Sequence, residues 1–103
     1  MATNRPLSYT VWSGNVEVGI LGAEIVVRAP ANTWDSFTKF GLRGLLFGGG
    51  VTEVRLPMAV ATAHYSGGVL RVYELGQPWL ILEGVHDHYV ATDFAEEVRR
   101  FRR

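Results

Sequence analysis

The sequence predicts an α+β domain built mainly from about seven short antiparallel strands, arranged as a barrel or a sandwich. Three observations support this fold class. Short segments rich in β-branched and aromatic residues recur along the chain, with glycine-containing turns between them. The turns are short enough to be hairpins, which join antiparallel strands. The segment 91–103 instead repeats apolar side chains at helical spacing, so one helix should close the chain.

Alternation and turn residues define the expected strands. In "VEVGIL", apolar side chains alternate with Glu17, which is typical of a half-buried strand. The turns "SGN", "SGG" and "GQP" contain residues that tolerate positive φ or favour chain reversal. Pro30 should end one strand, because proline cannot donate to a ladder, and Pro57 should mark a break or an edge. The expected strands are 9–12, 16–21, 23–29, 51–56, 59–66, 68–75 and 79–85.

The stretch "ANTWDSFTKFG" interrupts the strand pattern and favours a short helix near 32–40. Asn32 or Thr33 could cap it, and Gly41 would follow its C-terminal end. Three aromatic residues lie at helical spacing, and an irregular aromatic-rich loop is the alternative. These residues are Trp34, Phe37 and Phe40.

The end of the chain predicts an amphipathic helix over 92–102. Thr92 or Asp93 would cap it, and Asp93 with Glu96 has the spacing of a capping box. Acidic residues come early and arginines late, which suits the helix dipole. The apolar stripe expected to face the core consists of Phe94, Val98 and Phe101.

Length and composition restrict the class of protein. The chain has 103 residues, which fits one domain over 1–103. Its formal net charge of zero argues against a nucleic-acid partner. The absence of cysteine excludes disulfides and Cys-ligated zinc. No apolar run approaches the roughly 18 residues of a transmembrane segment, and the N-terminus lacks the apolar core of a signal peptide. We therefore expect a cytoplasmic protein.

The order of elements resembles the pleckstrin-homology (PH) superfold, in its bacterial PH-like or GRAM-like variants. The resemblance is strongest over "VTEVRLPMAVATAHYSGGVLRVYELGQPWLILEGVHDHYVATDFAEEVRRF", which spans 51–101. It includes a strand closing on Leu56-Pro57, a hairpin, an "ILEG" strand and a last helix. The segment 31–50 departs from that plan. The resemblance implies a binding or scaffolding module rather than an enzyme, and it carries over no lipid-binding residues.

The stretch "RGLLFGGG" at 43–50 invites comparison with a phosphate-binding loop, but it lacks the Lys and the Ser or Thr of such loops and leads into a strand pattern. We interpret Gly48, Gly49 and Gly50 as a flexible bend or flap. The apolar run before them is either an exposed tip for a partner or membrane contact, or part of the core.

The histidines are the residues in the sequence whose spacing suggests a metal site. His86 and His88 are two residues apart and would share one face of a strand, where His64 or Glu83 could join them around zinc or another divalent ion. The stretch is also typical of a solvated turn before the helix. We expect no metal and no other cofactor.

Three functions are compatible with these patterns. The first is a non-catalytic interaction module that binds a protein partner along a strand edge or forms a homo-oligomer, with the first strand (9–12) as either the edge or a segment swapped between copies. The second is binding of an apolar small molecule or lipid in an aromatic-lined mouth gated by the "FGGG" loop. An enzyme or metal protein using the histidines is the third. The expected contact residues are Trp34, Phe37, Phe40, Arg43, Leu46 and Phe47.

Overall fold

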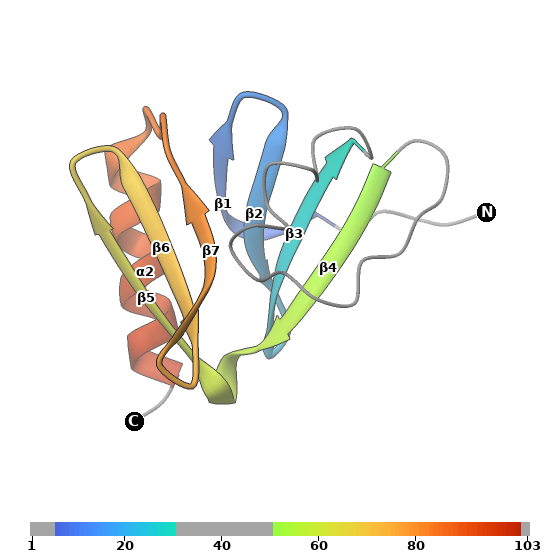
Figure 1. Cartoon of the computed structure of the whole chain (residues 1–103), viewed down its shortest axis with the longest axis vertical. Coiled ribbons are helices and arrows are strands. Elements are labelled where there is room, and N and C mark those ends of the chain that lie inside the picture. Colours follow the sequence, from blue (N-terminus) through green and yellow to red (C-terminus); the bar gives the residue numbers. More distant parts are fainter. Residues whose placement is uncertain (1–5, 31–50, 102–103) are drawn as a thin grey trace.

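The structure is a computed structural model that describes residues 6–30 and 51–101. Within these ranges the chain forms strands and one helix in the expected order (Figure 1). The elements are β1 (Ser8–Ser13), β2 (Val16–Leu21), β3 (Glu24–Pro30), β4 (Val51–Pro57), the 3-10 helix η2 (Met58–Val60), β5 (Ala61–Ser66), β6 (Val69–Glu74), β7 (Gln77–Leu82) and α2 (His88–Phe101).

The described strands form two antiparallel sheets. One has four strands in the order β1-β2-β3-β4, and the other has three in the order β5-β6-β7. The sheets face each other as in a sandwich and are not closed into a barrel (Figure 1). After Pro57, η2 carries the chain from one sheet to the other. The predicted α+β class, with seven strands and a C-terminal helix, is confirmed for the described residues, and the sandwich is the correct alternative.

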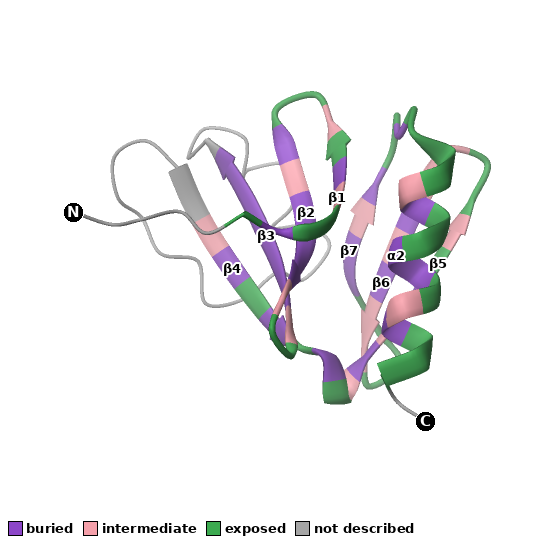
Figure 2. Cartoon of the chain, turned by 180° about the vertical axis from the view of Figure 1, so that it is seen from behind, coloured by how far each residue is buried: buried purple, intermediate pink, exposed green. Residues whose placement is uncertain are grey.

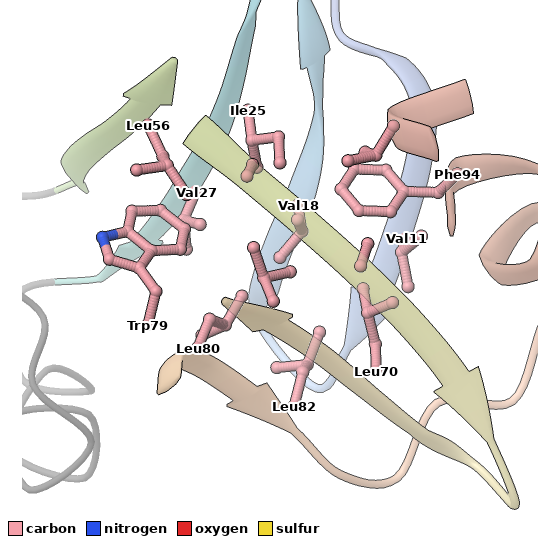
Figure 3. Packing of buried hydrophobic residues seen from close by; sticks show 14 of the residues in the cluster. Val11, Val18, Ile25, Val27, Leu56, Leu70, Trp79, Leu80, Leu82 and Phe94 are labelled. Carbon is pink, nitrogen blue, oxygen red and sulfur yellow. The ribbon is translucent and has the colours of Figure 1, made fainter. Parts of the chain in front are cut away.

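The core lies between the two sheets, because alternation sends one set of side chains from each strand inward. In the four-stranded sheet, cross-strand partners Val11, Val18, Val27 and Val54 form one buried row. Figure 3 shows leucines of the second sheet packing toward this row. In Figure 2, the buried residues lie along the strands of both sheets and on one side of α2.

Strand β7 departs from simple alternation at Trp79. Val72 pairs with Leu80 and Tyr73 with Pro78, so Trp79 is an extra residue on β7, as in a β-bulge. Both Trp79 and Leu80 are consequently buried, although they are adjacent in sequence. The indole lies beside Val27 and Leu56 in Figure 3, where it fills the space between the second sheet and β3–β4.

Helix α2 begins one turn earlier than the sequence indicated. It starts at His88 rather than near residue 92. The backbone N–H of Val90 donates to Oδ1 of Asp87 at 3.1 Å, so Asp87 is the capping residue, and the predicted caps Thr92 and Asp93 lie inside the helix. The early acidic residues expected in the first turn are therefore absent from it.

The buried face of α2 also differs from the prediction at one position. Its buried side chains are those of Ala91, Phe94, Ala95 and Val98, while Phe101 is 44% exposed. Phe94 and Val98 thus confirm the predicted stripe, and its extension to Phe101 is wrong. The helix packs against β1 and β5, closing one side of the sandwich (Figure 2). No helix among the described residues is long and apolar enough to cross a membrane.

Candidate functional site: the free edge of strand β4

Most of the predicted contact residues lie outside the described part of the chain. This applies to the short helix expected near 32–40 and to the glycine-rich loop. The residues concerned are Trp34, Phe37, Phe40, Arg43, Leu46, Phe47, Gly48, Gly49 and Gly50. Their roles stay predictions from the sequence.

The three histidines are described and do not gather around one point. His64 is exposed on β5 and alternates with Tyr65, so the two side chains occupy opposite faces of the strand. A hydrogen bond joins the Tyr65 hydroxyl to Nδ1 of His88, and the rings lie 5.6 Å apart between centroids. His86 is exposed in the loop before α2. Within 6–30 and 51–101, no three His, Asp or Glu side chains form a group that could hold a metal ion.

Strand edges are the remaining candidates for a binding surface, because an edge presents backbone groups that can pair with another chain. Two of the four described edges are flanked by the helix. The hydrogen bond between Tyr65 and His88 ties β5 to the first turn of α2. Tyr9 on β1 donates its hydroxyl to Oε1 of Glu97 at 3.5 Å. Both edges therefore have α2 as a neighbour.

Strand β1 is also irregular, which makes it a poor template for a further strand. Its register with β2 shifts between Ser8 and Val11. Tyr9, inside this shift, has a φ of 53°, in the left-handed region that side chains larger than glycine rarely adopt. Of the two alternatives for this segment, an edge strand or a swapped piece, the structure has β1 as an edge strand of its own sheet, and this edge is irregular and partly covered.

The edge of β7 is interrupted as well. Pro78 has no N–H, and the bulge at Trp79 follows it immediately. Beyond the end of the strand, the carbonyl oxygen of Glu83 accepts a hydrogen bond from the Ser13 hydroxyl. This end of β7 is therefore tied to β1 of the other sheet.

Strand β4 is the exception among the four edges. All seven of its residues, Val51 to Pro57, pair in continuous register with β3, without a bulge. Among the described residues, no strand pairs with β4 on the side away from β3. The strand is thus regular, and no other described strand covers its outer edge.

The register identifies which backbone groups of β4 point to the open side. In the hairpin between β2 and β3, two residues join the closing pair Leu21 and Glu24, which makes this pair hydrogen-bonded. Because backbone groups point to alternate sides along a strand, the N–H and C=O groups of Val27 point toward β4. Those of its partner Val54 point back toward β3. The backbone groups of Glu53 and Arg55 therefore point away from the sheet.

The side chains at this edge belong to an ion-pair network on the outer face of the sheet. Glu53 lies 2.8 Å from Nε of Arg28 and 2.7 Å from Nη2 of Arg55, measured at its carboxylate oxygens. Arg55 also reaches Oε1 of Glu24 at 3.2 Å. Arg28 is 8% exposed, although its alternation places it on the outer face. The edge therefore carries both charge signs.

The network shifts the ionisation of its members. Burial alone would raise the pKa of the Glu53 carboxyl, but hydrogen bonds from Arg28 and Arg55 and their positive charges outweigh burial, so the pKa lies below its ordinary value. Hydrogen bonds to Glu53 and Glu24 raise the pKa of the Arg55 guanidinium. Both groups therefore stay charged at neutral pH.

No protein-family model, curated protein or solved structure matches this chain. The resemblance to PH-like and GRAM-like domains therefore stays a prediction from the sequence.

Sequence reasoning missed Glu53 and Arg55 as candidate binding residues. The segment was correctly predicted as a strand, and its charges alternate with Val54 and Leu56. That alternation alone is equally typical of a solvated face on an inner strand. The edge position of β4 follows from the order of the strands in the sheet, which the local sequence does not contain.

Proposed function

We propose that this domain is a non-catalytic, PH-like interaction module that binds an extended protein segment at the free edge of β4. The proposal rests on a contrast among the four described edges. Of these, only β4 is unbulged, paired on one side and not flanked by α2. Backbone groups at such an edge supply affinity by strand addition, and alternate side chains supply selectivity.

The backbone groups and side chains along β4 suit an extended peptide as the binding partner. The free N–H and C=O groups of Glu53 and Arg55 are spaced as in a sheet, so a chain in strand conformation can pair with both residues. The side chains of Val54 and Leu56 are buried on the inner face. An added strand would place its own inward residues beside them and its polar residues beside the ion pairs.

The second function predicted from the sequence, binding of an apolar small molecule or lipid, depends on Trp34, Phe37, Phe40 and Phe47. These residues lie outside the described ranges, and that function stays a sequence prediction, as does a bacterial, cytoplasmic setting. Interaction at β4 is the function that the described residues favour.

A titration of the ¹⁵N-labelled protein with a panel of seven-residue peptides, each alternating apolar and polar residues, tests the proposal. We expect the amide shifts to concentrate at Glu53 and Arg55, since these N–H groups would gain hydrogen-bond partners. At protein concentrations low enough for the chain to be monomeric, shifts that gather on another element, or no shifts with any peptide, would contradict it.

Two substitutions at one position sharpen this test. Arg55→Pro removes the outward N–H and keeps the ladder to β3, whereas Arg55→Ala removes the same side chain and keeps the N–H. Peptide binding should be lost in Arg55→Pro and retained in Arg55→Ala. Equal binding by both variants would mean that the β4 backbone is not the contact.

A further inference from the structure

The charges on the edge of β4 are arranged so that this strand complements itself. In the sequence "VTEVRLP", Glu53 and Arg55 lie one on each side of Val54. Their backbone groups point to the open side of the strand, and their side chains share the outer face. An antiparallel second copy meets this edge with the same residues in reverse order.

We infer that the occupant of the β4 edge is a second copy of this chain, paired antiparallel with Val54 on the two-fold axis. This inference rests on the proposed function and names its partner. In this register Glu53 of one copy is opposite Arg55 of the other, and each such pair can exchange two backbone hydrogen bonds. The four-stranded sheets of the two copies then join into one continuous sheet, by an isologous contact.

Charge selects this register over its neighbours. Pairing that uses the same outward backbone groups can shift only in steps of two residues, as the groups alternate along the strand. One such step in either direction brings Glu53 opposite Glu53 of the other copy, or Arg55 opposite Arg55. Like charges directly opposite each other destabilise a pair of strands, whereas opposite charges stabilise it. Only the register centred on Val54 gives opposite charges on both sides of the axis.

The ion pairs within one copy are compatible with this contact. Glu53 keeps Arg28 as a partner at 2.8 Å, and Arg55 keeps Glu24 at 3.2 Å. The pair between Glu53 and Arg55 at 2.7 Å is exchanged for two equivalent pairs between the copies. Because Arg55 is 46% exposed, its reorientation requires little loss of burial. No charge is left without a partner by the exchange.

Sedimentation velocity over a wide concentration range tests the inference with two matched charge reversals. Arg55→Glu places a second carboxylate opposite Glu53 at both sites, and Arg100→Glu makes the same change on exposed α2, where Arg100 pairs with Glu97 at 2.9 Å. We expect wild type and Arg100→Glu to form dimers by mass action. Arg55→Glu should raise the dimer dissociation constant about tenfold or more, because two attractive pairs become repulsive. A melting curve verifies that each variant is folded.

A cysteine at the axis tests the register itself and does not depend on a charge change. The chain has no cysteine, so Val54→Cys introduces a single thiol. Cysteine is nearly the same size as the valine it replaces. In the proposed dimer the two substituted positions form a non-hydrogen-bonded pair with Cα atoms roughly 4.5 Å apart, which a disulfide can span. Mild oxidation should cross-link Val54→Cys and leave Arg55→Cys largely uncross-linked, because residue 55 lies opposite residue 53.

The outcomes separate this inference from the proposed function. A wild-type monomer at all concentrations, or a dimer that neither Arg55→Glu weakens nor Val54→Cys cross-links, overturns the second copy as occupant. Peptide-induced shifts at Glu53 and Arg55 would then still support the interaction module. Absence of both dimer and peptide shifts would overturn both.

Discussion

The two edges of the four-stranded sheet limit further strand pairing by different means. At β1 the backbone itself is bent: the register shifts, Tyr9 has a φ of 53°, and α2 packs alongside. At β4 the backbone is regular over seven residues, and among the described residues its outer face carries the charged side chains of Glu53 and Arg55. A bulged edge disfavours pairing with any further strand, whereas a charged edge disfavours mainly strands that place like charges opposite it. β4 is therefore the edge at which selective pairing can occur.

Helix α2 packs against β1, and its anchor is Phe94. This ring is fully buried and lies beside Val11 of β1 in Figure 3. We expect Phe94→Ala to lower the free energy of unfolding by about 3–5 kcal/mol, from lost burial and the cavity that remains. Chemical denaturation followed by circular dichroism measures this.

Phe101→Ala is the matched control on the same helix, because Phe101 is 44% exposed. This substitution should lower the free energy of unfolding by less than about 1 kcal/mol. Similar costs for the two substitutions would mean that α2 is not anchored through Phe94, and the contrast between a covered β1 and an open β4 would lose its basis.

Acidic pH should weaken the ion pairs of β4 more than the contacts that cover β1. The pKa of Glu53 is lower in the folded protein than its ordinary value of 4.5, so the unfolded chain binds more protons in acid. The stabilisation from Glu53 is therefore present above about pH 4.5 and is lost as the pH falls through the folded pKa.

Unfolding free energies measured between neutral pH and acid check this expectation. Glu53→Gln should reduce the slope of the acid limb, because the titrating carboxyl is gone. Glu96→Gln, on the exposed face of α2, is the control and should leave the slope unchanged. Equal slopes in wild type and Glu53→Gln would show that the ion pairs at β4 do not contribute to stability.

The smallest expected effect concerns the hairpin turn that leads into the interrupted edge β7. Leu75 has a φ of 50° and is 75% exposed, so its side chain gains little in return for a left-handed conformation. Leu75→Gly should raise the free energy of unfolding by about 0.5–1 kcal/mol. Gly76→Ala should do the reverse, since Gly76 has a φ of 82°. Thermal melts resolve the two signs, and a loss of stability in Leu75→Gly would contradict the account of this turn.

Much of the fold could be predicted because its signals are local. The strand expected at 16–21 matches β2 (Val16–Leu21), as alternation and the flanking turns fix both ends. Pro57 marks the end of β4, where proline costs no ladder bond. The start of α2 was placed too late because Asp87 was interpreted as a turn residue, although the same side chain can cap a helix.

The candidate site could not be predicted in the same way. Whether Glu53 and Arg55 lie at an edge depends on which strand β4 pairs with, and this is a contact between distant parts of the chain. The bulge that turns Trp79 inward likewise depends on pairing with β6. The aromatic residues of the sequence predicted a contact site at Trp34, Phe37 and Phe40, which lie outside the described residues.

Amide hydrogen exchange of Trp12 and Arg55, measured from dilute to concentrated protein, tests the central claim most directly. Both N–H groups point away from the sheet, one at the β1 edge and one at the β4 edge. We expect exchange at Arg55 to slow as the concentration rises while exchange at Trp12 stays unchanged, because a second copy pairs with β4 alone. Slowing at Trp12, or exchange at Arg55 that does not depend on concentration, would contradict self-association through β4.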